Sequence, residues 1–258
     1  TCHLFFYRIT LTNCELFELK VLCFIPSYNE FSNLQPLISK IEDENYKIDE
    51  FLFIDSGSSD GSLDIIKNSG YNYISLPENK GLGYLFIKAI DYSIKNNFDI
   101  LVVLSGNNKM NPADFKKVLD PILFDSYDFT WGSRFIEDGK AINTPKFRKT
   151  SIPLFSKAVS FIFNRNVTDA TNGFRAFKLS VLLDVLENYD QRWLYGYSFE
   201  TYLFGLILSK KSIKSKEVPV EIKYKKAEKH TKIKPFLDYP SIIVPFFIAK
   251  IVSLFDKK

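Results

Sequence analysis

The chain has 258 residues, 46% of them apolar, and a net charge of +4. This length and apolar share suffice for one large α/β domain with a buried core, whereas the mild charge argues against a nucleic-acid partner. Three cysteines without metal-ligand spacing and two histidines indicate neither a disulfide framework nor a zinc site, which suits a reducing cytosol.

Strand and helix patterns alternate after an N-terminal extension, residues 1–19, which lacks the residue order of a signal peptide. We expect strands near 20–26, 50–55, 71–75, 98–104 and 127–131. We expect helices near 33–43, 60–68, 81–96 and 112–121. This alternation predicts a single α/β domain with a mostly parallel central sheet and helices on both faces.

Two segments refine this prediction. Residues 98–104 are almost continuously apolar, as expected for a central strand that is buried on both sides. In the helix expected at residues 81–96, four apolar side chains are spaced four positions apart and predict one buried stripe. They are Leu82, Phe86, Ile90 and Ile94. No linker separates residues 20–132 from residues 133–234, so we expect two halves of one domain.

Polar turns follow the first two expected strands. Pro26, Tyr28 and Glu30 follow the first, and Asp55 and Ser56 end the second. A tyrosine ring can cover a base, carboxylates can bond to base or ribose, and the start of the helix near residue 60 can supply free N–H groups. Because the carboxyl ends of parallel strands meet at one edge, these turns predict a nucleotide site. The alternative for residues 55–60 alone is a capped turn.

Five motifs occur in order along the chain: Ile25-Pro-Ser-Tyr-Asn-Glu30, Ile54-Asp-Ser-Gly-Ser-Ser-Asp-Gly-Ser62, Asn79-Lys-Gly-Leu-Gly83, Gly132-Ser-Arg-Phe135 and Thr171-Asn-Gly-Phe-Arg-Ala-Phe177. Together they resemble the family 2 glycosyltransferases of GT-A (Rossmann-like) fold, in particular the dolichyl-phosphate mannose and polyprenyl-phosphate hexose synthase branch. The resemblance covers residues 20–240. It implies inverting transfer of a hexose from a nucleotide-diphosphate sugar to a lipid phosphate or similar acceptor, and it places Lys80 with the turns above on the donor side.

The chain departs from this family after the fourth strand. The family usually has Asp-x-Asp there, which holds Mg²⁺ or Mn²⁺ on the donor diphosphate, but this chain has Ser105 and Asn107. A hard dication prefers anionic oxygen ligands. Lys109 could supply a permanent positive charge instead. We therefore hypothesise metal-independent or weakly metal-dependent transfer with Asn107 and Lys109 at the diphosphate. The alternatives are a bound Mg²⁺ or Mn²⁺, or a loop that has lost function around a solvated lysine.

Three arginines are candidates for binding phosphate. Arg134 and Arg148 resemble positions that bind the acceptor phosphate in lipid-phosphate synthases, and guanidinium groups suit phosphate geometry. Arg175 matches a family motif on the donor side, but bonding to backbone carbonyls is an equal alternative.

Two further residues have candidate roles. Glu200 lies where relatives with hydroxyl acceptors keep a catalytic base, although it could be an acid favoured by a helix start. Lys232 lies in a stretch that closes over the donor phosphates in relatives, so the resemblance makes it a candidate clamp.

The last part of the chain suits a membrane surface. Between Lys210 and Lys234 there are ten lysines and three acids, and the apolar tail 235–258 follows. The tail contains Asp238, Pro240, Pro245 and Lys250, so we expect an amphipathic helical segment on an anionic bilayer rather than across it. The alternative is a solvated lysine face beside a core helix.

These observations predict a glycosyltransferase at the cytoplasmic face of a membrane that uses a nucleotide-sugar donor and a polyprenyl or dolichyl phosphate acceptor. A second possibility is transfer to a saccharide hydroxyl in surface polysaccharide assembly, with Glu200 as base. A third is a degenerate domain that binds nucleotide without catalysis. The donor base and sugar stay open, because Tyr28, Asp55 and Ser56 suit several.

Overall fold

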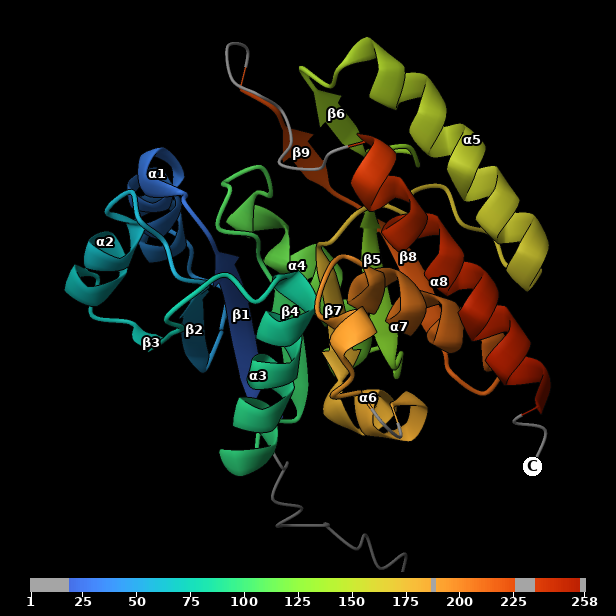
Figure 1. The fold of residues 1–258 in the computed structure, drawn as a ribbon, viewed down its shortest axis with the longest axis horizontal. Coiled ribbons are helices and arrows are strands. Elements are labelled where there is room, and N and C mark those ends of the chain that lie inside the picture. Colours follow the sequence, from blue (N-terminus) through green and yellow to red (C-terminus); the bar gives the residue numbers. More distant parts are fainter. Residues whose placement is uncertain (1–18, 187–188, 226–234, 256–258) are drawn as a thin grey trace, which may run out of the picture.

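A mixed sheet forms the centre of the molecule (Figure 1). The computed structural model describes residues 19–186, 189–225 and 235–255. Within these ranges seven strands pair in the order β3-β2-β1-β4-β7-β5-β8, and β6 pairs with β9. β7 is antiparallel to both neighbours, and the other pairs are parallel. The strands are β1 (Val21–Ser27), β2 (Glu50–Asp55), β3 (Asn72–Ser75), β4 (Ile100–Val103), β5 (Phe129–Ser133), β6 (Lys140–Ile142), β7 (Arg175–Lys178), β8 (Ser215–Pro219) and β9 (Glu221–Lys223).

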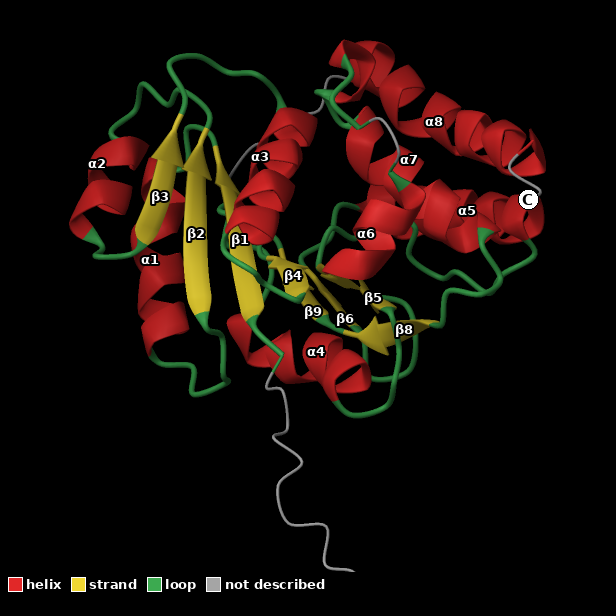
Figure 2. Ribbon diagram, turned by 90° about the horizontal axis from the view of Figure 1, so that it is seen from below, coloured by secondary structure: helices red, strands yellow, loops and turns green. Residues whose placement is uncertain are grey.

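Helices cover both faces of the sheet, as predicted. Side chains of α1, α2 and α4 form one buried cluster with the sheet, and side chains of α3 and α5 to α8 form the other. Figure 2 shows α5, α7 and α8 stacked together. The helices are α1 (Phe31–Glu42), α2 (Ser62–Asn68), α3 (Leu82–Lys95), α4 (Phe115–Leu123), α5 (Lys146–Phe163), α6 (Leu179–Val185), α7 (Ser198–Ser209) and α8 (Pro235–Phe255), with short 3₁₀ turns η1 (Pro112–Asp114) and η2 (Arg192–Leu194).

The expected central strand is confirmed, since all four residues of β4 are buried. The stripe predicted for α3 is partly wrong. Phe86 and Ile90 are buried, but Leu82 is only half-buried and Ile94 is 42% exposed. Positions four apart advance slightly more than one helical turn, so the stripe rotates about 40° at each step. By the last step the side chain has turned out of the interface.

The order of the strands creates a crevice between β1 and β4. The chain builds β1, β2 and β3 outward in one direction and then places β4 on the other side of β1. The loops after β1 and β4 therefore diverge at the carboxyl edge, which is where ligands bind in open α/β sheets. Gly106 joins the loop after β4 to the end of β1, because its N–H donates to the Pro26 carbonyl oxygen at 3.1 Å. A Cβ at Gly106 would lie 2.8 Å from that oxygen.

α8 is part of the packed structure. Its Phe246 is 1% exposed and contacts the rings of Phe163 and Phe204. The helix approaches α7 closely at Gly205, where a Cβ would lie 2.7 Å from the Cβ of Ala249. The predicted helix at the end of the chain is therefore confirmed, and one of its faces belongs to the core.

A larger side chain at Gly205 should force α7 and α8 apart. We expect Gly205→Leu to lower the free energy of unfolding by about 1–3 kcal/mol, the usual cost of overpacking, as measured by urea denaturation. Gly196→Ala is the control, since a Cβ there meets nothing within 4 Å. Equal unfolding midpoints for the two variants would contradict the packing of α8 on α7.

Candidate active site

A cleft with a volume of about 880 Å³ opens at the carboxyl edge of the sheet. Its walls come from the loops after β1 and β4, from the starts of α3, α5 and α7, and from the end of β9. The structure brings most of the predicted site residues together here, although they are far apart in the sequence. Those that line the cleft are Pro26, Tyr28, Glu30, Ser56, Ser105, Asn107, Lys109, Arg134, Arg148, Arg175 and Glu200.

The structure places two predicted donor residues outside the cleft lining. The Asp55 carboxylate is completely buried and accepts hydrogen bonds from the N–H and hydroxyl of Ser58. The Lys80 ammonium pairs with Glu78 at the surface, and only the Lys80 backbone N–H reaches toward the site, donating to Ser56 Oγ at 3.3 Å. A third, Lys232, lies outside the described residues.

The turn after β2 supports the turn after β1. Ser58 Oγ accepts from the Asn29 N–H at 2.9 Å, and Asp60 Oδ2 accepts from the Phe31 N–H at 3.1 Å. The Ser62 N–H, at the start of α2, donates to Asp60 Oδ1 at 3.0 Å. The expectation that this helix start offers free N–H groups to a ligand is therefore wrong for Ser62. Here the second motif acts as the capped turn that holds the first motif at the edge of the cleft.

The residues after β4 do not fit a hard divalent cation. Ser105 and Asn107 offer neutral oxygen atoms, and the Asn107 side-chain oxygen already accepts from the Lys109 N–H at 3.1 Å. Among the described residues that line the cleft, the carboxylates are those of Glu30 and Glu200. The described parts of the chain also contain no group of three His, Cys, Asp or Glu side chains that could hold a metal ion. Mg²⁺ and Mn²⁺ prefer carboxylate oxygens, which this loop lacks.

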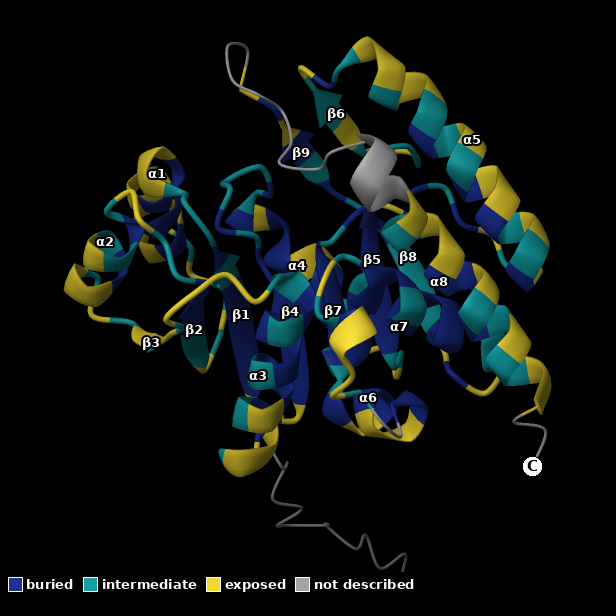
Figure 3. Ribbon diagram, viewed as in Figure 1, coloured by how far each residue is buried: buried dark blue, intermediate teal, exposed yellow. Residues whose placement is uncertain are grey.

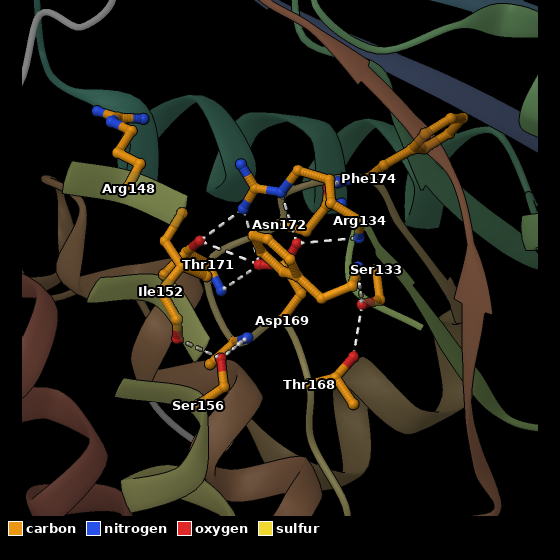
Figure 4. Close-up of polar contacts among 12 residues, drawn as sticks. Ser133, Arg134, Arg148, Ile152, Ser156, Thr168, Asp169, Thr171, Asn172 and Phe174 are labelled. Carbon is orange, nitrogen blue, oxygen red and sulfur yellow. Dashed lines mark hydrogen bonds and ion pairs between the residues drawn. The ribbon is translucent and has the colours of Figure 1, made fainter. Parts of the chain in front are cut away.

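Arg134 forms a buried ion pair with Asp169 (Figure 4). Its Nε lies 2.6 Å from Oδ2 of Asp169 and its Nη2 lies 2.8 Å from Oδ1, and the two side chains are 4% and 0% exposed. Burial alone would lower the pKa of Arg134, but the bonds and charge of Asp169 raise it. Further bonds to Thr171 and Tyr224 leave one of the five guanidinium N–H groups for a ligand. Arg134 therefore has at most one N–H group with which to make the predicted contact to a phosphate.

Tyr224 gathers three cations at the end of β9. Its hydroxyl oxygen accepts from Nη1 of Arg134 at 2.9 Å and from Nη1 of Arg148 at 3.2 Å. Its ring lies 5.3 Å from the Lys109 ammonium and 5.7 Å from the Arg148 guanidinium carbon. Sequence reasoning missed Tyr224, which carries no charge and belongs to none of the five motifs. Asp169 was also missed, although it lies two residues before the last motif.

Arg175 bonds to backbone carbonyls, which is the alternative to ligand binding that the sequence left open. It is 3% exposed, and its guanidinium donates to the backbone carbonyls of Asn172, Ala170 and Glu200 at 2.8, 3.1 and 3.0 Å. Burial lowers its pKa. These bonds tie the loop before β7 to the start of α7, and they explain why this motif needs an arginine.

Glu200 lies in the first turn of α7, half-buried in the cleft wall. Burial raises the pKa of its carboxyl, and the nearby Arg175 opposes the increase. The side chain lies over Gly173, where a Cβ would come within 3.2 Å of Glu200 Oε1. A carboxyl in a cleft with a raised pKa has the properties of a general base or acid.

Three buried polar atoms of the cleft lining have no hydrogen-bond partner among the described residues. They are Ser27 Oγ, Asn33 Oδ1 and Asn172 Nδ2, on side chains that are 2%, 9% and 3% exposed. Unpaired buried polar atoms are costly. Their residues line the cleft, so these atoms belong to its polar wall.

Removing the charge of Asp169 should strongly destabilise the fold. We expect Asp169→Asn to lower the free energy of unfolding by about 3–5 kcal/mol, because the buried guanidinium of Arg134 then lacks its counter-charge. Urea denaturation measures this loss. The matched control is Asp184→Asn, which breaks an exposed pair with Lys210 and should cost about 1 kcal/mol or less. Similar losses in both variants would contradict the role of the Arg134–Asp169 pair.

Comparison with known proteins agrees with this architecture. Residues 23–186 match the family described as glycosyl transferase family 2. The UDP-N-acetylglucosamine–dolichyl-phosphate N-acetylglucosaminyltransferase of Methanococcus voltae is 27% identical over 218 residues, which cover 78% of this chain and 84% of the relative. The undecaprenyl-phosphate mannosyltransferase of Micrococcus luteus is 26% identical over 196 residues, covering 72% and 79%.

A solved structure shows the same fold. Glucosyl-3-phosphoglycerate synthase from Mycobacterium tuberculosis, in complex with Mn²⁺, UDP and glucosyl-3-phosphoglycerate, superposes with a TM-score of 0.64. The two chains are 17% identical, and the match covers 90% of this chain and 80% of the other. This chain therefore belongs to glycosyltransferase family 2 and is an enzyme of the GT-A fold.

Proposed function

We propose that this glycosyltransferase moves a hexose from a nucleotide-diphosphate sugar to a polyprenyl or dolichyl phosphate, with inversion at the anomeric carbon. Two relatives named above use dolichyl phosphate or undecaprenyl phosphate. The observation that carries the proposal is the composition of the cleft. Polar residues line it at the carboxyl edge of the sheet, and Arg148 lines it together with apolar residues of α5 and α8.

The donor end of the cleft is polar. Tyr28 and Glu30 follow β1, Ser56 follows β2, and Ser105 follows β4. This is the crevice where α/β folds bind nucleotides. The fold relative from M. tuberculosis was solved with UDP, which supports a nucleoside diphosphate as the ligand here.

The acceptor end combines charge with apolar surface. Arg148 is in the first turn of α5 and lines the cleft. Two apolar residues of the same helix, Phe147 and Ile152, line it too. Ile243 of α8 also lines the cleft. A phosphate at the end of a hydrocarbon chain needs this combination, because its head binds a guanidinium while its tail stays on apolar surface.

The transfer step follows from these two ends. An anionic phosphate oxygen of the acceptor attacks the anomeric carbon and forms the new C–O bond. The bond from this carbon to the diphosphate breaks, and its electron pair leaves on the nucleoside diphosphate. No proton has to be removed from the acceptor, so Glu200 is not needed as a base.

The same surface suits attachment to a membrane from the cytoplasmic side. Exposed positions recur along both α5 and α8 (Figure 3). On α5, Phe147, Leu154 and Phe161 are 68%, 69% and 90% exposed, next to the exposed Lys146, Lys149 and Lys157. On α8 the exposed apolar residues are Ile243, Val244, Phe247, Ile251, Leu254 and Phe255.

We name this set of α5 and α8 residues the apolar face. Its apolar side chains and neighbouring lysines suit an anionic lipid surface. Within the described residues, no helix is both long and apolar enough to cross a bilayer. We therefore propose peripheral binding through the apolar face, with α5 added to the tail that the sequence predicted.

Transfer to a saccharide hydroxyl is the second candidate, because Glu200 lies in the cleft with a raised pKa. The two candidates differ in their need for a base.

With purified protein, polyprenyl phosphate in detergent and a panel of nucleotide sugars, we expect a glycosylated lipid. Glu200→Gln should leave this rate within about threefold, whereas loss of a required base would lower it roughly 10²–10⁴-fold.

Arg148→Gln should raise the KM for polyprenyl phosphate, while Lys211→Gln, an exposed lysine far from the cleft lining, should not. Transfer only to saccharides would favour the second candidate. Absence of transfer and of donor hydrolysis with every nucleotide sugar would indicate the degenerate domain instead.

Membrane binding can be measured by flotation with vesicles of phosphatidylglycerol and phosphatidylcholine. We expect the protein to float with anionic vesicles, and Leu154→Asp with Phe161→Asp to lower the bound fraction at least tenfold, since each buried side chain contributes about 1.5–3 kcal/mol. Phe124→Asp is the matched control, because Phe124 is 75% exposed but follows α4 on the other face of the sheet. Equal flotation of both variants would refute the apolar face.

A further inference from the structure

The cleft is rich in positively charged side chains, and the loop after β4, which forms part of its wall, has no carboxylate. Among the described lining residues, six carry a positive charge and two a negative charge. Arg134 and Arg175 are bound inside the protein. The other four, Lys109, Arg148, Lys223 and Lys225, belong to the loop after β4, the start of α5 and the end of β9.

Backbone contacts hold the loop after β4 against β9. The Lys223 N–H donates to the Lys109 carbonyl oxygen at 2.9 Å, and Met110 forms a β-bridge with Ile222. These contacts bring two lysines that are more than a hundred positions apart in the sequence to neighbouring positions on the cleft wall.

A third lysine reaches the same loop from α1. The Lys40 ammonium donates to Asn108 Oδ1 at 2.8 Å. The pKa of Lys40 is lowered, first by partial burial and then by the charge of Lys223, while Glu221 opposes this. Lys40 does not itself line the cleft, but its bond to Asn108 holds the loop that carries Lys109.

Tyr224 contacts two of these cations, Lys109 and Arg148. Its ring lies under the Lys109 ammonium, and its hydroxyl accepts from Arg148. Two buried polar atoms, Ser27 Oγ at the end of β1 and Asn33 Oδ1 on α1, have no hydrogen-bond partner among the described residues, and both residues line the same cleft. They add to the polar character of the cleft wall.

We propose that Lys109 and Lys223 take the place of a divalent cation at the donor diphosphate, so that this chain binds nucleoside diphosphates without metal. The inference rests on the proposed function and deepens it at the donor site. The electron pair of the breaking bond moves onto the diphosphate, and the two ammonium groups compensate its charge. The Asn107 amide, held in the same loop, supplies a neutral hydrogen bond.

Calorimetric titration with UDP and GDP tests this proposal on the full chain. In EDTA we expect the favoured nucleotide to bind with a Kd within about threefold of that in MnCl₂. Lys109→Gln with Lys223→Gln should weaken binding in EDTA at least tenfold, the effect of losing charge-assisted bonds. Lys95→Gln, an exposed lysine at the far end of α3, is the control and should change nothing. Circular dichroism checks that each variant is folded.

A reciprocal variant gives a second readout. Ser105→Asp with Asn107→Asp restores two carboxylates after β4, and it should weaken binding in EDTA and make it respond to Mn²⁺. If the unaltered chain binds nucleotide only with Mn²⁺, the lysine proposal is overturned while the proposed function stands. If neither nucleotide binds under any condition, both fail.

Discussion

The buried pair of Arg134 and Asp169 is the constraint on which the cleft depends. Asp169 is itself held from behind, because Glu217 on β8 accepts the Asp169 N–H at 2.9 Å as well as the indole N–H of Trp131. The pair fixes the end of β5 against the loop before β7, and the remaining donors of Arg134 orient Tyr224. Through Tyr224 the same pair determines where Arg148 and Lys109 lie. A buried ion pair thus positions the charged side chains of Arg148 and Lys109, which line the cleft.

A second constraint joins the two halves of the chain. The N–H groups of Gly83 and Tyr84, at the start of α3, donate to the carbonyls of Gly196 and Tyr195 at 3.1 and 3.2 Å. The contact is so close that a Cβ at Gly83 would lie 1.8 Å from the carbonyl oxygen of Leu194. The start of α7, and with it Glu200, is thereby fixed against the nucleotide half. The N-terminal and C-terminal halves of the chain are therefore packed together at this wall of the cleft.

The electrostatics of the cleft follow a consistent logic. A metal-binding carboxylate pair brings negative charge that the cation must first offset, whereas lysines and arginines bring positive charge directly. This chain has Ser105 and Asn107 in the loop after β4, and Lys109 from that loop and Lys223 from β9 line the same cleft. Apolar residues of α5 and α8, among them Ile152 and Ile243, line the cleft as well.

Local patterns in the sequence predicted β1 to β5, α1 to α4 and the helical tail, because alternation and turn residues act over a few positions. They also identified Tyr28, Arg148 and Glu200, which all line the cleft. The sequence could not decide between alternative roles for one side chain. Asp55 and Arg175 look like ligand-binding residues, but Asp55 is buried and accepts from Ser58 within its own turn, and Arg175 donates to backbone carbonyls that include the distant one of Glu200. Only the fold revealed Asp169, Tyr224 and Lys223, since their importance arises from partners that are distant along the chain, and burial and pairing across such distances leave no local pattern.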